Sequence, residues 1–314
     1  MGKIVVIGSS NTDLVIRTPR IPSPGETLIG SDFMINAGGK GANQAVQCAR
    51  LSAHVTMVAA ARMGGDVCFV ACVGDDGFGA EAVRHYAGEG IDTSYIVRRN
   101  GVASGVALIA VDDAAENSIV VAPGANALLS PADIDAVESE IAAADYLLVQ
   151  LEIPMETVAR TTELAVRHGV RVILNPAPAA PIADEVLARL DLITPNRSET
   201  ELLTGLKVEN VGDAVAAAAW FRGRGVRRVA VTMGSAGALV ADERGEEFVP
   251  AYRVEAVDTT AAGDVFNGAL AVALSEGREL GAAARFAAAA SSIACTRIGA
   301  QRSIPQRREV DSAE

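Results

Sequence analysis

Short apolar segments alternate with longer segments of helical periodicity along most of the chain. The apolar segments cover residues 3–7, 146–150, 170–174, 191–194 and 226–232. Helical patterns separate them, most clearly at 154–168, 211–224 and 280–296, and Pro131 is expected to open another helix up to about Ala143. Apolar strands that alternate with helices of ten to fifteen residues are typical of a mostly parallel sheet with helices on both faces. The pattern therefore predicts an α/β fold with a mostly parallel central sheet.

Two regions depart from this pattern. Residues 14–36 alternate apolar and polar positions around a proline-rich turn, and residues 104–121 alternate in a similar way. Both patches predict short antiparallel strands. We expect them to form a small β sheet that lies over a ligand site as a lid. Because no linker precedes the short charged tail at 306–314, residues 1–314 are expected to form one major α/β domain with this lid.

A tandem repeat of twelve residues interrupts the chain. Residues 47–58 (QCARLSAHVTMV) and 59–70 (AAARMGGDVCFV) align without a gap, and only the second copy continues into V-G-D-D. Twelve extra residues in a helix would rotate the next strand by about 120° and displace it by about 18 Å. We therefore expect one copy to bulge out and the second copy to supply the strand before Gly74.

Composition and charge narrow the class of protein. The chain has 314 residues, of which half are apolar, and a net charge of −12. This charge argues against a nucleic-acid partner and against an anionic membrane surface. No apolar run is long enough to span a bilayer, the first residues read as a strand, and the four cysteines form no C-x-x-C pair. These features favour a cytoplasmic protein with reduced thiols.

The most informative stretch is D-T-T-A-A-G-D-V-F-N-G at residues 258–268. Its small residues Ala261, Ala262 and Gly263 allow a tight turn, and a helical pattern begins beside Asp264. The free N–H groups at the start of a helix bind phosphate, and an acid placed there can act as a base toward an alcohol. A plain strand-to-helix turn with Asp264 as the helix cap is the alternative.

Polar residues that follow other apolar segments are candidates for a polyol site. Asn11 and Asp13 follow the first strand, where open α/β sheets bind ligands. The glycine-rich stretch at 36–45 brings Lys40 and Asn43 as hydrogen-bond donors, and Glu152 follows the strand at 146–150. The respective alternatives are an Asx turn, a glycine-rich start of a helix near residue 41, and a surface carboxylate.

Two further turns suit a nucleotide. Asn196 and Glu199 follow a strand and have the spacing for phosphate contact and for Mg²⁺ held through water, although a helix N-cap with a capping box explains them equally well. The turn at 232–237 (T-M-G-S-A-G) suits the phosphates or ribose of a nucleotide, and a hairpin turn is the alternative.

Together and in this order, the motifs resemble the ribokinase family of carbohydrate kinases, from Lys3 to about Pro305. The matching motifs are N-T-D, G-G-K-G-A-N-Q-A, V-G-D-D-x-F-G, Q-L-E, N-P-A-P, T-P-N-x-x-E, T-M-G-S-A-G, D-T-T-A-A-G-D-V-F-N-G-A-L and T-R-I-G-A-Q-x-S-I-P. Each motif is weak alone, and the combination is a strong signal. The repeat is the departure, because the family has one helix–strand unit where this chain carries twelve additional residues.

The resemblance implies ATP-dependent phosphorylation of D-ribose at its 5-hydroxyl. Asp264 would be the base, and the amides of Ala261, Ala262, Gly263 and Asp264 would form the anion hole. The implied ribose-binding residues are Asn11, Asp13, Gly39, Lys40, Gly41, Asn43, Glu152 and Asp264. The implied ATP-binding residues are Asn196, Glu199, Thr232, Met233, Gly234, Ser235, Ala236, Gly237, Gly263 and Ala288.

The resemblance also implies two cations and a subunit partner. Asn196 and Glu199 would support Mg²⁺. The implied ligands of a monovalent cation, usually K⁺, are Asp258, Thr260, Ala294, Arg297, Gly299 and Ser303. A homodimer through the lid is expected. Two other hypotheses stay open: a related kinase for another pentose, a ketohexose or a nucleoside, and a non-catalytic sugar-binding protein on the same fold.

Overall fold

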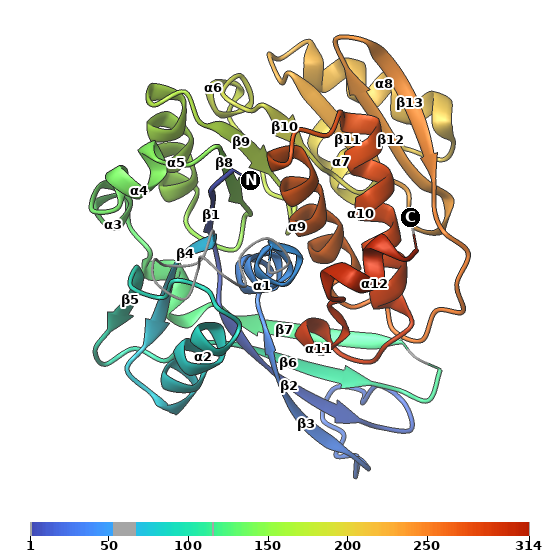
Figure 1. Ribbon diagram of the computed structural model, residues 1–314. Helices are drawn as coiled ribbons and strands as arrows, with labels where there is room; N and C mark the ends of the chain where they lie inside the picture. Colours follow the sequence, from blue (N-terminus) through green and yellow to red (C-terminus); the bar gives the residue numbers. More distant parts are fainter. Residues whose placement is uncertain (1, 53–66, 115, 314) are drawn as a thin grey trace.

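The central feature of the computed structural model is a long mixed sheet (Figure 1). The structure describes residues 2–52, 67–114 and 116–313. Within these ranges, nine strands pair in the order β13-β12-β11-β10-β9-β8-β1-β4-β5. They are β1 (Ile4–Ile7), β4 (Val67–Gly74), β5 (Ile96–Arg99), β8 (Tyr146–Val149), β9 (Arg171–Leu174), β10 (Leu192–Ile193), β11 (Arg228–Thr232), β12 (Gly237–Asp242) and β13 (Gly245–Pro250). All neighbours pair parallel except β11–β12 and β12–β13, so the predicted mostly parallel sheet is confirmed.

Helices cover both faces of the sheet because its central strands are apolar on both sides. In β1, Ile4 and Val6 pack with α1 (Lys40–Ser52), α9 (Ala262–Ser275) and α10 (Leu280–Cys295). Val5 and Ile7 point the other way. Other helices are α2 (Gly77–Gly88), α3 (Pro131–Asp135), α4 (Glu138–Ala142), α5 (Met155–Arg167), α6 (Asp184–Leu187), α7 (Arg197–Thr204), α8 (Val211–Arg222), α11 (Ala300–Ser303) and α12 (Arg307–Asp311), with short 3₁₀ turns η2 (Gly124–Leu128) and η3 (Gly234–Ala236). No helix in the described ranges is long and apolar enough to cross a membrane.

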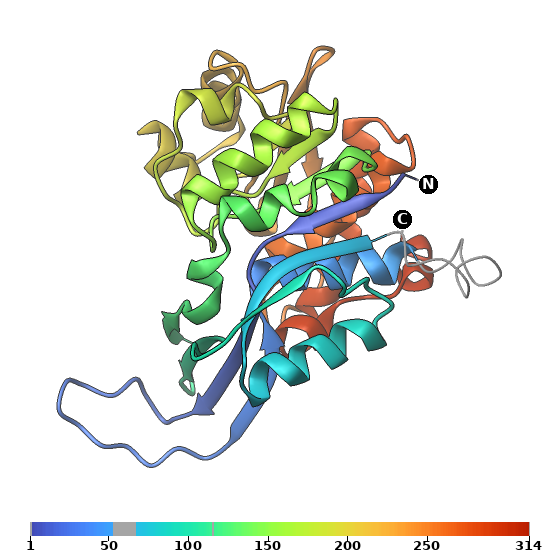
Figure 2. The same ribbon diagram turned by 90° about the vertical axis from the view of Figure 1, so that its left-hand side faces the viewer.

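A second, small sheet projects from the main body (Figure 2). In the part of the chain that the structure describes, it has the order β3-β2-β6-β7. Its strands are β2 (Asn11–Arg17), β3 (Phe33–Gly38), β6 (Gly105–Val111) and β7 (Asn117–Ala122). The two predicted patches therefore do form one sheet. The β2–β3 and β6–β7 hairpins are antiparallel as predicted, but β2 and β6 join them by a parallel pairing that the pattern did not predict.

The tandem repeat lies between α1 and β4. Helix α1 ends at Ser52, in the first copy, and β4 begins at Val67, in the second copy. The prediction that the second copy supplies the strand before Gly74 is confirmed. The predicted bulge falls on 53–66, which are outside the described residues. Strand β4 nevertheless pairs with β1 along its first four residues, from Val67 to Val70.

Two predicted boundaries are wrong. The helix expected from Pro131 to about residue 143 is divided into α3 and α4, because the backbone at Val137 (φ −110°, ψ 16°) leaves the helical region. The expected charged tail at 306–314 contains helix α12, in which Arg307 pairs with Glu276 and Val310 is fully buried. A five-residue helix with one apolar anchor is too short to give a readable period.

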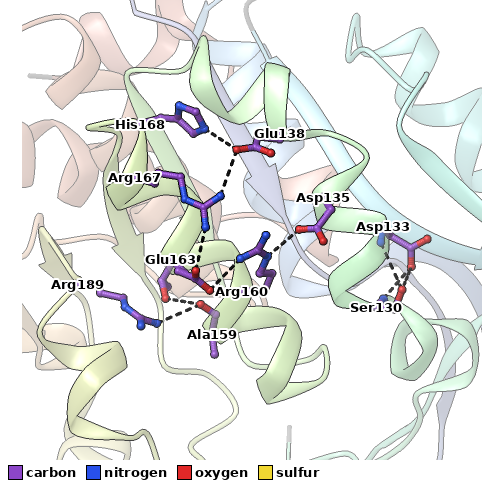
Figure 3. A network of polar contacts seen from close by, with 11 residues as sticks. Ser130, Asp133, Asp135, Glu138, Ala159, Arg160, Glu163, Arg167, His168 and Arg189 are labelled. Carbon is purple, nitrogen blue, oxygen red and sulfur yellow. Dashed lines mark hydrogen bonds and ion pairs between the residues drawn. The ribbon is translucent and has the colours of Figure 1, made fainter.

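A network of polar side chains joins α3 and α4 to α5 (Figure 3). Arg160 of α5 bonds Asp135 at 2.7 Å, and His168 bonds Glu138 at 2.8 Å. Arg167 links Glu138 to Glu163. These groups are partly or largely exposed, so solvent and salt screen each pair and its contribution to stability is small. The network ties α3 and α4 to α5, and none of the candidate site residues belongs to it.

The contact between α1 and α9 sets the position of the first turns of both helices. An added Cβ at Gly268 would lie 2.7 Å from the Gln47 Cβ and 2.9 Å from the backbone oxygen of Gln44. Only glycine allows the two helix backbones to approach this closely. The position of Asp264, one turn before Gly268, therefore depends on this contact.

We predict that Gly268→Ala lowers the free energy of unfolding by about 1–3 kcal/mol, because α1 and α9 must separate. Gly88→Ala, at the end of α2 where an added Cβ meets nothing within 4 Å, is the control and is expected to be neutral or to stabilise slightly. Urea denaturation of both variants measures the difference. Equal stabilities would show that the helix contact is not restrictive.

Candidate active site

Asp264 lies in the first turn of α9, where the strand ends and the start of α1 converge. Its side chain is 6% exposed. Its Oδ2 accepts a hydrogen bond from Nδ2 of Asn43 at 2.8 Å, and its Oδ1 accepts one from Nε2 of Gln44 at 3.0 Å. The N-cap of α9 is Ala261, and no side chain caps the helix. The alternative of Asp264 as a helix cap is therefore wrong, and its carboxylate faces the site.

The turn before Asp264 presents backbone N–H groups. Ala261 has a left-handed backbone (φ 61°), the only positive φ of a non-glycine residue among those described. The N–H groups of Ala262 and Val265 bond Thr259 and Ala261, whereas those of Gly263 and Asp264 have no acceptor in the described part of the chain. Two free N–H groups at the positive end of a 14-residue helix are suited to an anion. The anion hole predicted from Ala261 to Asp264 stays a prediction, and the Ala262 N–H is already bonded to the Thr259 carbonyl.

Several carboxylates surround one ammonium group at this point. We call Asp13, Glu152, Glu199 and Asp264 the carboxylate cluster, and all four act electrostatically on Lys40. Burial opposes the charge of Lys40, but these carboxylates together raise its pKa. The ammonium therefore stays charged at neutral pH. In the described residues it forms no ion pair within 4.0 Å, so its donors are available to a ligand.

The same crowding also shifts the pKa values of the acids. Burial, and then repulsion from Glu152 and Asp264, raises the pKa of Asp13 to about 7. Burial also raises the pKa of Asp264, against the charge of Lys40 and the hydrogen bonds from Asn43 and Gln44. Perturbed acids that converge at the carboxyl ends of parallel strands are typical of a functional site.

The polar end of β1 is fixed by its neighbours. Asn126 of η2 accepts from the Ser10 N–H at 2.9 Å and donates to Oδ1 of Asn11 at 2.7 Å. Glu152 accepts from the Lys40 N–H at 3.0 Å and from the Ser9 hydroxyl. The half-buried Glu152 carboxylate therefore ties α1 to β1, which a carboxylate free on the surface would not do.

The glycines beside Lys40 are required by packing. Gly39 has φ 90°, and an added Cβ there would lie 2.7 Å from the Asn11 nitrogen. A Cβ on Gly41 would lie 2.6 Å from the carbonyl carbon of Gly8. The interpretation as a glycine-rich start of a helix accounts for both residues, and α1 begins at Lys40. A contact of Gly39 and Gly41 with a ligand stays a prediction.

The structure adds buried polar residues that the sequence analysis did not assign. Gln44 bonds Asp264 and Asn175 and accepts from Gln150. Thr194 donates to Asn267, whose amide in turn holds the carbonyl of Gly263 at 2.8 Å. Gln150, Asn175 and Thr194 follow strands β8, β9 and β10, so the rule that located Asn11 also applies to them. Their signal was present in the N-P-A-P, Q-L-E and T-P-N motifs.

The candidate nucleotide residues lie at the next strand ends. Asn196 caps α7 in a reciprocal capping box with Glu199, as the structural alternative proposed, with hydrogen bonds of 2.8 Å. Burial raises the pKa of Glu199.

The turn after Thr232 joins the antiparallel β11 and β12, so the hairpin interpretation also holds. Met233 is buried, Gly234, Ser235 and Ala236 are exposed, and a Cβ on Gly237 (φ 126°) would collide with the Val249 oxygen. Ala288 lies in α10, which packs beside β12 and β13.

The candidate cation residues come from the loop before α9, from the end of α10, from the loop that follows α10 and from α11, and Asp258 joins the two loops. Its carboxylate accepts from the N–H groups of Thr260 and Gly299, each at 2.8 Å. Although burial acts in the other direction, these hydrogen bonds lower the pKa of Asp258. The Arg297 guanidinium bonds Glu309, so it is engaged away from Asp258. Ala294 and Ser303 are buried, and the Ser303 hydroxyl donates to the Ala300 carbonyl at 2.8 Å.

Comparison with known proteins identifies the family of this chain. The model of the pfkB family carbohydrate kinases matches residues 1–307. A ribokinase of Haemophilus influenzae is 44% identical over 306 residues, which cover 98% of this chain and 96% of the relative. A ribokinase structure from Thermotoga maritima is 40% identical and superposes with a TM-score of 0.88, covering 99% of both chains. An Arabidopsis thaliana ribokinase complexed with ribose and ATP is 31% identical, with a TM-score of 0.87 and coverage of 99% of this chain and 98% of that one. This chain belongs to the pfkB family of carbohydrate kinases.

Proposed function

We propose that this kinase transfers the γ-phosphoryl group of ATP to the 5-hydroxyl of D-ribose. The observation that carries the proposal is the buried carboxylate of Asp264. It lies in the first turn of α9, where the N–H groups of Gly263 and Asp264 have no acceptor in the described part of the chain. The relatives named above are ribokinases, and one was solved with both ribose and ATP. A base beside an anion site is the arrangement that transfer of a phosphoryl group to an alcohol requires.

Each of the candidate residues would have a distinct role in this reaction. Asp264 accepts the proton of the attacking hydroxyl, and the N–H groups of Gly263 and Asp264 stabilise charge that develops on the transferred phosphoryl group. Asn43 has a buried Oδ1 with no partner among the described residues, so it can accept from a sugar hydroxyl. Asn11, Asp13, Gly39, Gly41 and Glu152 bind and orient the sugar, and the Lys40 ammonium donates to it. Most of the rate enhancement comes from position and electrostatics.

The remaining candidates bind the nucleotide and its metal ion. Glu199 is nearly buried and interacts electrostatically with Lys40 and Asp264, which supports a role for its charge beside the transferred phosphate. Its capping-box bonds leave carboxylate lone pairs free. Asn196 and Glu199 would therefore hold Mg²⁺ through water, and the ion would neutralise phosphate charge. The turn at 232–237 and Ala288 would line the ATP site.

The two loops joined by Asp258, together with the end of α10 and with α11, would bind K⁺. The donor set is one carboxylate with hydroxyl and carbonyl oxygens from Thr260, Ala294, Arg297, Gly299 and Ser303, and oxygen ligands suit such an ion. Arg297 can contribute only its carbonyl, because its guanidinium bonds Glu309. The hydrogen bonds of Asp258 to both loops support this assignment. A bound cation would hold the α9 turn against the loop at 296–300.

The small sheet is proposed to be a lid and a dimer contact. Its register brings Leu14, Ile35, Leu108 and Val120 opposite one another, on the face away from Asp13. Ile16, Phe33, Ile35, Leu108 and Val120 on this face are each at least 40% exposed. An apolar face of this kind favours association with a second copy. The opposite face would close over the sugar, so that a lid of this kind completes the α/β domain.

The test of the function is ADP release with ATP and a panel of D-ribose, 2-deoxyribose, fructose and adenosine. The highest kcat/KM with ribose supports the proposal. A higher value with another compound assigns a different substrate, and absence of ADP release with all of them assigns a non-catalytic binder.

We predict that Asp264→Asn lowers kcat by at least about a hundredfold, the range for loss of a positioned base. Ribose binding, measured by calorimetry, should persist. Because the base must be ionised and burial raises its pKa, wild-type turnover should fall as the pH falls through that raised pKa. Asp213→Asn, an acid in the first turn of α8, is the matched control and should keep wild-type turnover. Near-normal turnover of Asp264→Asn would remove this residue from the role.

We predict that replacing K⁺ by tetramethylammonium lowers turnover several-fold, because the α9 turn loses its tie to the loop at 296–300. Asp258→Asn should abolish the response to K⁺. Asp242→Asn, at the end of β12, should keep it. A K⁺ response that survives in Asp258→Asn would contradict this site.

We predict that the protein has twice the 32.3 kDa chain mass in light scattering. Leu108→Glu and Val120→Glu should give monomers, because each places a charge on the apolar face. Val166→Glu, at a residue of α5 that is 49% exposed, should leave the dimer intact. A monomer mass for the wild-type protein would reject the assembly.

A further inference from the structure

We propose that Gln44 is a positioning residue that fixes the orientation and the ionised state of Asp264. The inference rests on the proposed function and deepens it. Gln44 is fully buried in α1. Its Nε2 lies 3.0 Å from Asp264 Oδ1 and 3.0 Å from Asn175 Oδ1, and its Oε1 accepts from Gln150 Nε2 at 2.6 Å.

These contacts leave the Gln44 amide one favourable orientation. An amide has two N–H donors and one oxygen, and each of the three has a partner here. Reversing it would place its oxygen against the carboxylate of Asp264 and the oxygen of Asn175, where both neighbours are acceptors. The partners come from α9 and from the ends of β8 and β9, which are rigid elements. Gln44 therefore holds the base with a donor of fixed direction.

Gln44 and Asn43 hold different oxygens of the same carboxylate. Asn43 keeps a free Oδ1, so it can serve both the base and the sugar. Gln44 has no free group and acts only through Asp264. The charged groups that face Asp264 are Lys40 of α1, Glu152 after β8, Asp13 of β2 and Glu199 of α7. Three of the four disfavour its ionised form, so a hydrogen bond to Oδ1 helps to keep the base ionised.

The chain offers a matched control in the same helix. Gln47 lies one turn after Gln44 and is equally buried, but its amide atoms have no partner among the described residues. Methionine has nearly the shape of glutamine without its hydrogen bonds. Gln44→Met and Gln47→Met therefore change the same group at the same depth, and only Gln44→Met removes a bond to the base.

The experiment measures kcat and KM for ribose from pH 5 to 9 in wild type and both variants. For Gln44→Met we expect kcat to fall about tenfold to a hundredfold, as for loss of a hydrogen bond to an ionised group. KM for ribose should change little. The acidic limb of the kcat profile should move to higher pH, because the pKa of Asp264 rises. Gln47→Met should keep the wild-type kcat and profile, and thermal melting checks that both variants are folded.

Gln44→Glu gives a second, independent test. A negative charge beside Asp264 should move the acidic limb further than Gln44→Met does, in the order wild type, Gln44→Met, Gln44→Glu. An unshifted limb in folded Gln44→Met, or an equal loss of kcat in Gln47→Met, would overturn the role of Gln44. Failure of the proposed function is a different result, because the wild-type protein would then not phosphorylate ribose at any pH.

Discussion

The burial of several acids around a single lysine constrains the rest of this structure. Asp13, Glu152, Glu199 and Asp264 come from different elements, and removing such groups from water is costly unless opposite charge and hydrogen bonds compensate. Here Lys40 supplies the charge, and backbone N–H groups and side-chain amides supply the hydrogen bonds. This compensation is incomplete, because burial still raises the pKa values of Asp13 and Asp264. The hydroxyl groups of a ligand can donate further hydrogen bonds to these carboxylates.

The fold meets this constraint by bringing two helix starts to the same strand ends. Helix α1 places Lys40, Asn43 and Gln44 in its first turns, and α9 places Asp264 opposite them. The missing side chain of Gly268 lets the helices approach. Ala261 has a left-handed backbone, and the N–H groups of Gly263 and Asp264 after it have no acceptor in the described part of the chain. Positive charge from amides is thereby supplied locally in a protein whose net charge is −12.

Periodicity in the sequence was sufficient for the α/β fold and the small sheet, whereas the grouping of Asp13, Lys40, Asn43, Glu152 and Asp264 came from the resemblance to a family. It was not sufficient for contacts that depend on three dimensions. The parallel pairing of β2 with β6 and the bonds of Gln44 to residues more than a hundred positions away leave no local pattern. The sequence also did not show why Gly39 and Gly41 are glycines. In the structure, a Cβ at either position would collide with the backbone at Gly8 or Asn11, next to the end of β1.

The repeat has a consequence for how the chain can grow. Helix α1 stops at Ser52, at the opposite end of this 13-residue helix from Lys40, and β4 resumes its register with β1 at Val67. Strand pairing fixes the boundary at Val67, and helix packing fixes the boundary at Ser52. The chain therefore carries the repeat while the helix start with Lys40 and the pairing of β4 with β1 are both in place.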